Sequence, residues 1–286
     1  MNRKRIIVIC PGRGSYTRET HGYLKTYGHS SSKTIKYMDD ERLNAGLPSL
    51  TEIDTKIFKS SIHMKGEHAS TLIYACSLID YYSIDQSKYE IVAILGNSMG
   101  WYSTLSFSES LHYKKAYSLI DTMGSMMKKK IIGGQIIYSL TDDNWNLNRD
   151  LIRHCINETK KVGAHISIYL GGYIVIGGDQ KILNSLLKRL PKKENYPFQL
   201  PYHAAFHTPL LKSISKKAKE IFPKDMFLKP NIPIIDGRGY IWSPWSTNIK
   251  DLWSYTLGYQ VCNPYDFTRS MTVAIKEFSP DNIVLL

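Results

Sequence analysis

The sequence IVAILGNSMGWYS, residues 91–103, constrains the fold most, because an apolar run stops at Gly96 and helix-forming sequence follows Gly100. Ser98 stands between these two glycines. The pattern G-x-S-x-G after a buried strand is typical of a nucleophile elbow, a sharp strand-to-helix turn that exposes a serine hydroxyl above a sheet. A tight turn with a capping serine gives the same pattern, so the chemistry has to be argued from other residues.

Short apolar runs alternate with longer amphipathic stretches in the first half of the chain. We predict strands at 5–10 and 91–95 and helices at 66–83, 99–109 and 111–128. This alternation indicates parallel strands with crossover helices.

From about residue 132 the order of predicted elements changes. We predict β-α-β-β-α-β, the ferredoxin-like plan, with strands at 135–140, 165–170, 173–178 and 198–201 and helices near 144–159 and 180–190. Helices near 208–221, 249–258 and 265–278, a strand at 232–236 and a final apolar run follow. The prediction is therefore an α/β protein with a large subdomain, 1–129 and 198–286, interrupted by a small subdomain, 130–197.

Composition limits the class of protein. The 286 residues are 43% hydrophobic and 22% charged, enough for one large domain, alone or with an insert. Four cysteines (Cys10, Cys76, Cys155, Cys262) form no C-x-x-C pair, which argues against a zinc site or a disulfide framework and favours reduced thiols in a cytoplasmic protein. The first apolar run, of about five residues, is shorter than the roughly 7–15 of a signal peptide, and nothing approaches the roughly 18 apolar residues of a membrane span.

The formal net charge of +12 fits a nucleic-acid surface, an anionic membrane or an acidic protein partner. Lysine is spread along the chain in short clusters, such as 128–130, without an RNA-binding or zinc-finger signature. We interpret most of this charge as a solvated, lysine-rich surface and predict neither nucleic-acid nor membrane binding.

A serine hydroxyl needs a base to take its proton and donors to stabilise the oxyanion that forms. The N–H of Met99, at the start of the helix after the turn, is one candidate donor. The loop PGRGS, residues 11–15, offers a second near Arg13. This loop lacks the lysine and the spacing of a P-loop, so phosphate binding is the less favoured alternative.

Nine histidines compete for the role of base. His203 and His207 lie in LPYHAAFHTPLL, where the insert rejoins the large subdomain. Their i, i+4 spacing raises a metal site as an alternative, but H-A-A-F-H lacks the glutamate of H-E-x-x-H, and we predict no metal. His207, followed by Thr208 and Pro209 at an expected helix start, is the preferred base.

Five ordered motifs resemble the malonyl-CoA:acyl-carrier-protein transacylases and the acyltransferase domains of polyketide synthases. ICPGRGS resembles F-P-G-Q-G-S, GNSMGWYSTL resembles G-H-S-L-G-E-Y-S-A-L, and YIVIGG resembles a strand ending in V-I-S-G. AAFHTPLL is similar to H-A-F-H-S-P-L-M, and QVCNPYDFTRSM to Q-x-x-x-P-V-x-(W/F)-x-x-(S/T)-(V/M). The match is collinear from about residue 6 to residue 286.

The resemblance implies an α/β-hydrolase-like large subdomain and a ping-pong acyl transfer without a bound cofactor. Ser98 would attack an acyl-CoA or acyl-phosphopantetheine thioester with His207 as general base, and the thiol of an acidic acyl carrier protein, in a polyketide synthase complex, would take the acyl group. The backbone N–H groups of Arg13 and Met99 would form the oxyanion hole. The main-chain carbonyl of Gln260, with Asn263 close by, would orient the histidine.

The chain differs from the family at the position whose side chain binds the charged group of the substrate. Malonyl-using members carry an arginine on the helix after the elbow, which pairs with the substrate carboxylate. Here the segment is IDTMGSMM and Met123 takes the arginine's place. An unpartnered anion against an apolar side chain is costly, so we expect a free-standing enzyme for a small, non-carboxylated acyl group such as acetyl.

Other pocket positions differ as well. Arg13 replaces a glutamine; it could restore the lost charge, point to solvent or meet the pantetheine phosphates. Asn97 replaces the histidine before the nucleophile, His68 stands for a pocket glutamine, and Trp101 replaces a glutamate. Phe206 matches the family version associated with small, unbranched acyl groups.

Two other functions compete with transfer to a carrier thiol. A proofreading acyl hydrolase would use the same Ser98 and His207 and release the acyl group to water. A degenerate, non-enzymatic docking partner would explain the changes at Arg13, Asn97 and Trp101, but Ser98 and His207 are both retained. Transfer is therefore the preferred prediction.

Overall fold

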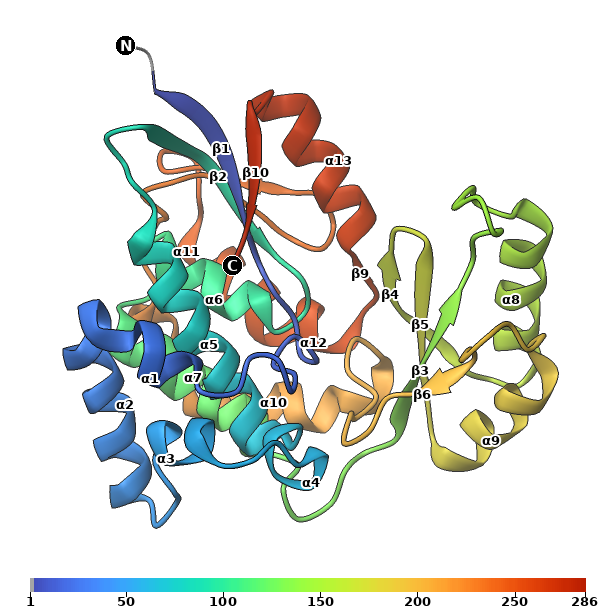
Figure 1. The fold of residues 1–286 in the computed structure, drawn as a ribbon. Coiled ribbons are helices and arrows are strands. Elements are labelled where there is room, and N and C mark those ends of the chain that lie inside the picture. Colours follow the sequence, from blue (N-terminus) through green and yellow to red (C-terminus); the bar gives the residue numbers. More distant parts are fainter. Residues whose placement is uncertain (1–2) are drawn as a thin grey trace.

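The computed structural model describes residues 3–286, with two sheets in two lobes (Figure 1). Its first part contains β1 (Lys4–Cys10), α1 (Tyr23–Tyr27), η1 (Gly28–Ser31), α2 (Ser32–Asn44), α3 (Leu50–Thr55), α4 (Ser60–His63), α5 (Gly66–Ser83), β2 (Tyr89–Gly96), α6 (Gly100–Phe107) and α7 (Tyr113–Ser125). The middle part contains β3 (Gly134–Ser139), α8 (Arg149–Lys161), β4 (His165–Leu170), β5 (Tyr173–Gly178), α9 (Gln180–Arg189) and β6 (Phe198–Gln199). The last part contains η2 (Pro209–Leu211), α10 (Lys212–Ile221), η3 (Lys224–Met226), β7 (Ile234–Ile235), β8 (Ile241–Trp242), α11 (Ile249–Ser254), η4 (Tyr255–Tyr259), α12 (Gln260–Cys262), β9 (Tyr265–Asp266), α13 (Phe267–Phe278) and β10 (Asn282–Leu285).

The first sheet has the order β10-β1-β2-β7-β8. The strands from β10 to β7 run parallel, as predicted, and the edge strand β8 pairs antiparallel with β7. The reversal occurs at a tight turn in which the N–H of Gly239 donates to the Asp236 carbonyl at 2.9 Å, with Gly239 at φ 75. The sheet is therefore mixed.

Both faces of this sheet are buried. Ile6 and Val8 of β1 pack in the main core with residues of α5 and α6, whereas Ile7 and Ile9 pack on the opposite face with Ala274 of α13. Figure 1 shows α13 on one side of the sheet and α5 and α6 on the other. Strands covered on both faces have continuous apolar sequences, and this is why the apolar runs at 5–10 and 91–95 predict buried strands.

The second sheet has the order β6-β3-β5-β4-β9. Its first four strands are antiparallel, and α8 and α9 contribute Cys155, Leu183 and Leu186 to its own core, so the predicted ferredoxin-like plan is confirmed. β6 belongs to this sheet although the predicted boundary at residue 197 precedes it, because Phe198 and Gln199 pair with β3. A fifth strand, β9, comes from the last part of the chain and runs parallel to β4.

Several elements differ from the predicted ones. The segment 23–63, for which no helix was predicted, holds four short α-helices and one turn of 3-10 helix. α8 begins at Arg149 rather than near 144, because Asn148 caps the helix and Asp142 organises a turn before it. The four cysteines are free, and within residues 3–286 no helix combines the length and apolarity that crossing a bilayer requires.

The turn after β2 and the loop after β1 are in backbone contact. A Cβ atom on Gly100 would lie 2.2 Å from the carbonyl oxygen of Cys10, and one on Gly96 would lie 2.3 Å from the carbonyl oxygen of Gly100. The N–H of Asn97 donates to the same Cys10 oxygen at 3.0 Å. Only glycine allows this approach, so the glycines of the G-x-S-x-G pattern are required by packing.

We expect Gly100→Ala to lower the free energy of unfolding by about 3 kcal/mol, because the new methyl group meets backbone that cannot move aside. Gly46→Ala is the control: its φ of 70 is unfavourable for alanine but nothing lies within 4 Å of the new Cβ. The control is expected to cost about 1 kcal/mol. Equal losses in urea denaturation of the two variants would contradict the packing argument.

Candidate active site

Ser98 lies in the turn between β2 and α6 with a left-handed backbone, φ 55. A non-glycine residue in this region is strained, and such strain concentrates at functional turns. The side chain is partly exposed, whereas the neighbouring Met99 and Gly100 are buried. The local geometry is that of the predicted elbow, with one hydroxyl presented at the end of a buried strand.

His207 meets Ser98 at the point where the chain returns from the second sheet to the first lobe. Its Nε2 lies 2.7 Å from the Ser98 Oγ, and its Nδ1 lies 2.5 Å from the carbonyl oxygen of Gln260. The imidazole is fully buried. Because a carbonyl oxygen only accepts, Nδ1 carries the proton and donates it to Gln260, which leaves the Nε2 lone pair facing the Ser98 hydroxyl.

Burial lowers the pKa of His207 to about 4, because the charged imidazolium loses its hydration; the hydrogen bond to Gln260 raises the pKa and opposes this shift only in part. Among residues 3–286 no carboxylate forms an ion pair with this ring. The imidazole is therefore neutral at pH 7, the state in which it could accept a proton from the serine hydroxyl.

Gln260 contacts both members of the pair. Its main-chain carbonyl accepts from His207, as described above, and its side-chain Nε2 donates to the Ser98 carbonyl at 3.0 Å. Its Oε1 accepts from the Tyr102 hydroxyl at 3.1 Å. Sequence reasoning missed Tyr102, although its position four residues after Ser98, one helical turn away, was a usable signal.

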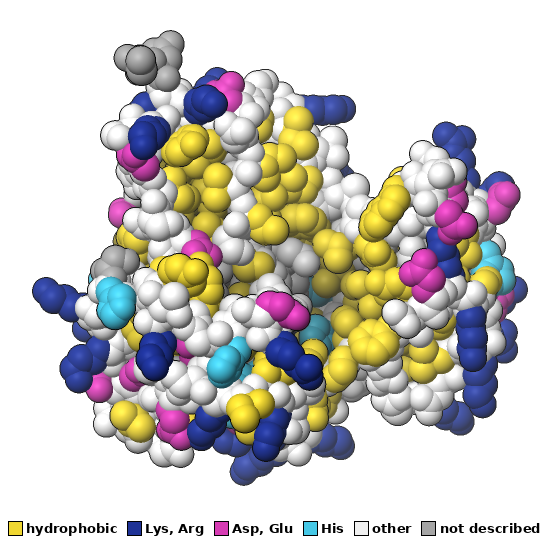
Figure 2. Space-filling view, in the orientation of Figure 1, with side chains coloured by type: hydrophobic (Ala, Val, Ile, Leu, Met, Phe, Trp, Pro, Cys, Tyr) yellow, Lys and Arg dark blue, Asp and Glu magenta, His cyan; other side chains and the backbone are white. Residues whose placement is uncertain are grey.

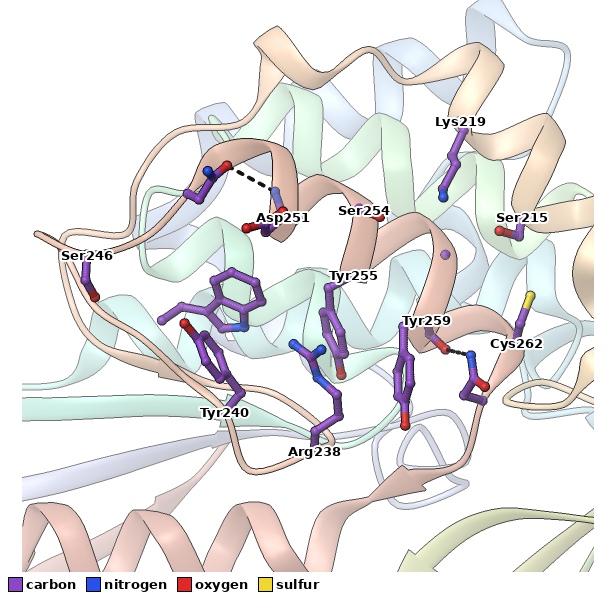
Figure 3. A pocket seen from close by; sticks show the side chains of 14 residues that line it. Ser215, Lys219, Arg238, Tyr240, Ser246, Asp251, Ser254, Tyr255, Tyr259 and Cys262 are labelled. Atoms are coloured by element: carbon purple, nitrogen blue, oxygen red, sulfur yellow. Dashed lines mark hydrogen bonds between the residues drawn. The ribbon is translucent and has the colours of Figure 1, made fainter.

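Asn263, predicted near the histidine, lies elsewhere. Its amide nitrogen donates to the Tyr259 carbonyl at 3.3 Å, and the residue lines a separate, open cavity of about 760 Å³ (Figure 3). In that cavity the Arg238 guanidinium faces the rings of Tyr255 and Tyr259, at 4.4 and 5.2 Å from their centroids. The hydrogen bonds of the His207 ring go to Ser98 and Gln260 and not to Asn263, so the orienting contact comes from Gln260 alone.

Two backbone N–H groups next to Ser98 are free to bind an oxyanion. In the part of the chain that the structure describes, neither the Met99 nor the Arg13 N–H donates a hydrogen bond to another residue. Met99 precedes the first residue of α6, where the helix dipole favours negative charge. A Cβ on Gly12 would lie 2.8 Å from the Asn97 carbonyl oxygen, so the loop carrying Arg13 packs directly on the elbow.

A small cavity of about 30 Å³ adjoins the serine. Its lining residues are Arg13, Ser70, Ser98, Met99, Tyr102, Ile120, Met123, Gly124, Phe206 and Gln260. A volume of this kind holds about two or three water-sized groups. A groove of about 260 Å³ shares Arg13, Gly124 and Phe206 with it and includes Lys65 and Lys128.

Three predicted pocket residues do not line this cavity, so their predicted roles need correction. The Nδ1 of His68 lies 2.7 Å from a guanidinium nitrogen of the buried Arg42, which holds the ring on another face of α5. Trp101 is fully buried and donates from Nε1 to the Thr256 hydroxyl at 3.0 Å. Asn97 lies under the turn, beside Gly12.

The second sheet supports the loop that carries His207. The Phe206 carbonyl accepts from the Ser167 hydroxyl at 2.8 Å and from Gln135 Nε2 at 3.3 Å. His203, the other member of H-A-A-F-H, places Nδ1 3.0 Å from Gln135 Oε1. Across residues 3–286 no group of three or more His, Cys, Asp or Glu is arranged to hold a metal ion.

The chain resembles known proteins in sequence and in fold. No family model matches it. It is 25% identical over 235 residues, 80% of this chain and 73% of the relative, to a malonyl CoA-acyl carrier protein transacylase of Buchnera aphidicola subsp. Schizaphis graminum. It superposes on the malonyl-CoA:ACP transacylase of Synechocystis sp. PCC 6803 with a TM-score of 0.78 and 14% identity, covering 99% of this chain and 97% of that one.

A third match is a complex between a type II polyketide synthase acyl-carrier protein and its malonyl-transacylase. The TM-score is 0.75 at 17% identity, with 98% of this chain and 87% of that chain covered. The two-lobed architecture described above, with an α/β-hydrolase-like large subdomain and a ferredoxin-like small one, is the fold of these enzymes.

The low pKa of His207 predicts how Ser98 reactivity depends on pH. We expect the rate of Ser98 modification by a sulfonyl fluoride to change less than about twofold between pH 8 and 5.5, because the imidazole stays neutral until the pH falls towards 4. A histidine with an ordinary pKa would lose about tenfold over this range. Intact-protein mass spectrometry gives the rates, and circular dichroism confirms that the protein stays folded. A midpoint near 6.5 would contradict the prediction.

Proposed function

We propose, from its relation in sequence and fold to the malonyl-CoA:acyl-carrier-protein transacylases, that this protein is a serine acyltransferase. It would pass a small acyl group from a thioester donor through Ser98 to the phosphopantetheine thiol of an acyl carrier protein. The observation that carries the proposal is the 2.7 Å contact between the Ser98 Oγ and the His207 Nε2, beside two free N–H groups and a small cavity.

In the first half-reaction His207 acts as general base. Its Nε2 accepts the Ser98 proton while Oγ attacks the thioester carbonyl, and the oxyanion is bound by the N–H groups of Met99 and Arg13. The imidazolium then gives its proton to the departing thiolate, which leaves an acyl ester on Ser98. In the second half the carrier thiol loses its proton to His207, the thiolate attacks the ester, and Ser98 is regenerated.

A carbonyl oxygen, rather than a carboxylate, orients the base. The Gln260 carbonyl fixes which nitrogen carries the proton, and its partial charge stabilises the imidazolium less than a full negative charge does. This arrangement fits a buried histidine that has to remain neutral between turnovers. The Gln260 side chain donates to the Ser98 carbonyl and would thereby fix the position of the Ser98 turn relative to His207.

The cavity supports a small acyl group. Met123, 2% exposed, and the Phe206 ring narrow it, which agrees with the expected preference for short, unbranched chains. The expectation that the acyl group is uncharged rests on Met123 alone. Arg13 lines the same cavity.

The surface is compatible with an acidic carrier protein. The net charge is +12, and Figure 2 shows Lys and Arg side chains spread over both lobes around a hollow lined with hydrophobic side chains. Positive charge of this kind speeds the encounter with an acidic partner. Action as a free-standing enzyme on carrier proteins of a polyketide assembly line is proposed from the sequence resemblance.

The function is tested by the fate of the acyl group. Incubation with a panel of acyl-CoA thioesters should give a mass adduct on Ser98 that is absent in Ser98→Ala, and His207→Ala should slow its formation by about 10²–10⁴-fold. Ser103→Ala, which removes a buried hydroxyl of α6 outside the site, is the control and should label normally.

Adding holo-carrier protein should then move the adduct to the carrier thiol. Release mainly to water, with carrier protein present, would replace the transferase by a hydrolase. No adduct with any thioester would favour the non-enzymatic docking role.

A further inference from the structure

Tyr265 lies beside the Ser98–His207 pair but outside the small cavity. Its side chain is 1% exposed, and the residue is absent from those that line the cavity. A buried tyrosine needs a partner for its hydroxyl as well as contacts for its ring. Here the hydroxyl and the ring each contact one side of the pair.

The hydroxyl of Tyr265 holds the start of the turn that carries Ser98. It donates to the Gly96 carbonyl at 2.5 Å, and Gly96 is the last residue of β2, two positions before Ser98. Ser98 has a φ of 55, a strained conformation that persists only where neighbouring contacts fix the backbone. Removing the hydroxyl would take this buried donor away from a carbonyl two residues from the nucleophile.

The ring of Tyr265 packs beside the imidazole of His207. The two ring centroids are 5.3 Å apart, and the ring planes are tilted by 57°. A Cβ atom on Gly237 would lie 2.6 Å from a ring carbon of Tyr265, so the ring packs directly on the Gly237 backbone. That backbone is itself fixed, because the Gly237 N–H donates to the Tyr255 hydroxyl at 2.8 Å. The imidazole therefore packs against a ring that has no room to move toward Gly237.

One strand of the second sheet supports both Tyr265 and His207. Tyr265 belongs to β9, which pairs with β4 through Ile168. The preceding residue of β4, Ser167, donates to the Phe206 carbonyl at 2.8 Å, directly before His207. The strand β4 thus fixes the tyrosine that holds the Ser98 turn and the loop that carries the histidine.

We propose that Tyr265 is a positioning residue for the reaction of Ser98, which keeps the serine Oγ within hydrogen-bonding distance of the His207 Nε2. The inference rests on the proposed function, in which Ser98 is the nucleophile and His207 its base. The hydroxyl fixes the Ser98 turn, the ring supports the imidazole, and the residue does not line the cavity in which an acyl group would lie. The motif that residues 260–271 resemble has valine in place of Tyr265. Because valine has no hydroxyl, the contact with Gly96 does not follow from the resemblance.

The test measures the modification of Ser98 by a sulfonyl fluoride at a range of reagent concentrations, followed by intact-protein mass spectrometry. Tyr265→Phe keeps the ring and removes only the hydroxyl. We expect the maximal rate to fall about tenfold, because a small displacement of the nucleophile from its base is enough for such a loss. The reagent concentration that gives half of the maximal rate should change less than about twofold, because Tyr265 does not line the cavity.

Tyr81→Phe is the matched control. Tyr81 is buried in the same core as Tyr265, and its hydroxyl donates to the Phe107 carbonyl at 3.0 Å, away from the cavity. Both variants lose a buried hydrogen bond to a carbonyl, so both should unfold at a lower urea concentration than the unmodified protein. Tyr81→Phe should nevertheless keep the maximal rate of sulfonylation within about twofold.

Gly237→Ala tests the ring independently of the hydroxyl. The new methyl group has to displace the Tyr265 ring, so the maximal rate should fall about tenfold. In a Tyr265→Val background the smaller side chain leaves room for the methyl group, and adding Gly237→Ala should change the rate less than about twofold. Equal slowing by Gly237→Ala in both backgrounds would contradict the role of the ring.

The inference is overturned if Tyr265→Phe keeps the maximal rate within about twofold, or if Tyr265→Phe and Tyr81→Phe slow the reaction equally. Sulfonylation needs no acyl donor. Failure of every acyl thioester to label Ser98, with the sulfonylation rates as expected, would therefore overturn the proposed acyl transfer alone. Absence of sulfonylation in the unmodified protein would overturn both.

Discussion

The contact between the backbone of Gly100 and the carbonyl of Cys10 positions the rest of the site. It brings together the turn that carries Ser98 and the loop that carries Arg13, although the two segments are far apart in sequence. The positions of Ser98, of the Met99 and Arg13 N–H groups and of the Arg13 side chain depend on this one approach of two strand ends. Neighbouring parallel strands end side by side, so the segments that follow them lie next to each other. Small residues at the crossing point are then enough to bring their backbones into contact.

The position of His207, the proposed base, depends on the second sheet. His207 is placed by a loop whose Phe206 carbonyl is held by Ser167 and Gln135 of the second sheet, and its own N–H donates to the Val261 carbonyl at 2.9 Å. Tyr265 packs beside the imidazole, 5.3 Å between ring centroids, and donates to the Gly96 carbonyl at 2.5 Å. Ser98 and His207 thus meet where the main core reaches the second sheet, because Ile168 and Val175 of that sheet belong to the same apolar cluster as Met99.

The sequence predicted those features of the fold and the site that depend on local sequence pattern and on the order of the motifs. The buried strands, the second lobe and the Ser98–His207 pair followed from apolar runs, glycines and collinear motifs. The side chain of Arg13 could not be placed, because its carbonyl partners are 51 and 189 positions away in the chain. The predicted pocket role of His68 was wrong for a different reason. Each residue along an α-helix turns the side-chain direction by about 100°, so a small error in register makes His68 face Arg42 instead of the cavity.

The strand β9 has a mechanical consequence. It pairs with β4 through Ile168 and Tyr265 and leads straight into α13, and the Thr268 hydroxyl accepts from the Gly171 N–H at 2.7 Å. The smaller lobe is thereby joined to the larger one by β9 as well as by the segments on either side of residues 134–199, so a hinge rotation would have to break the pairing of β9 with β4. For the proposed acyl transfer, we expect the donor and the acceptor thioester arms to enter and leave through an opening of constant width.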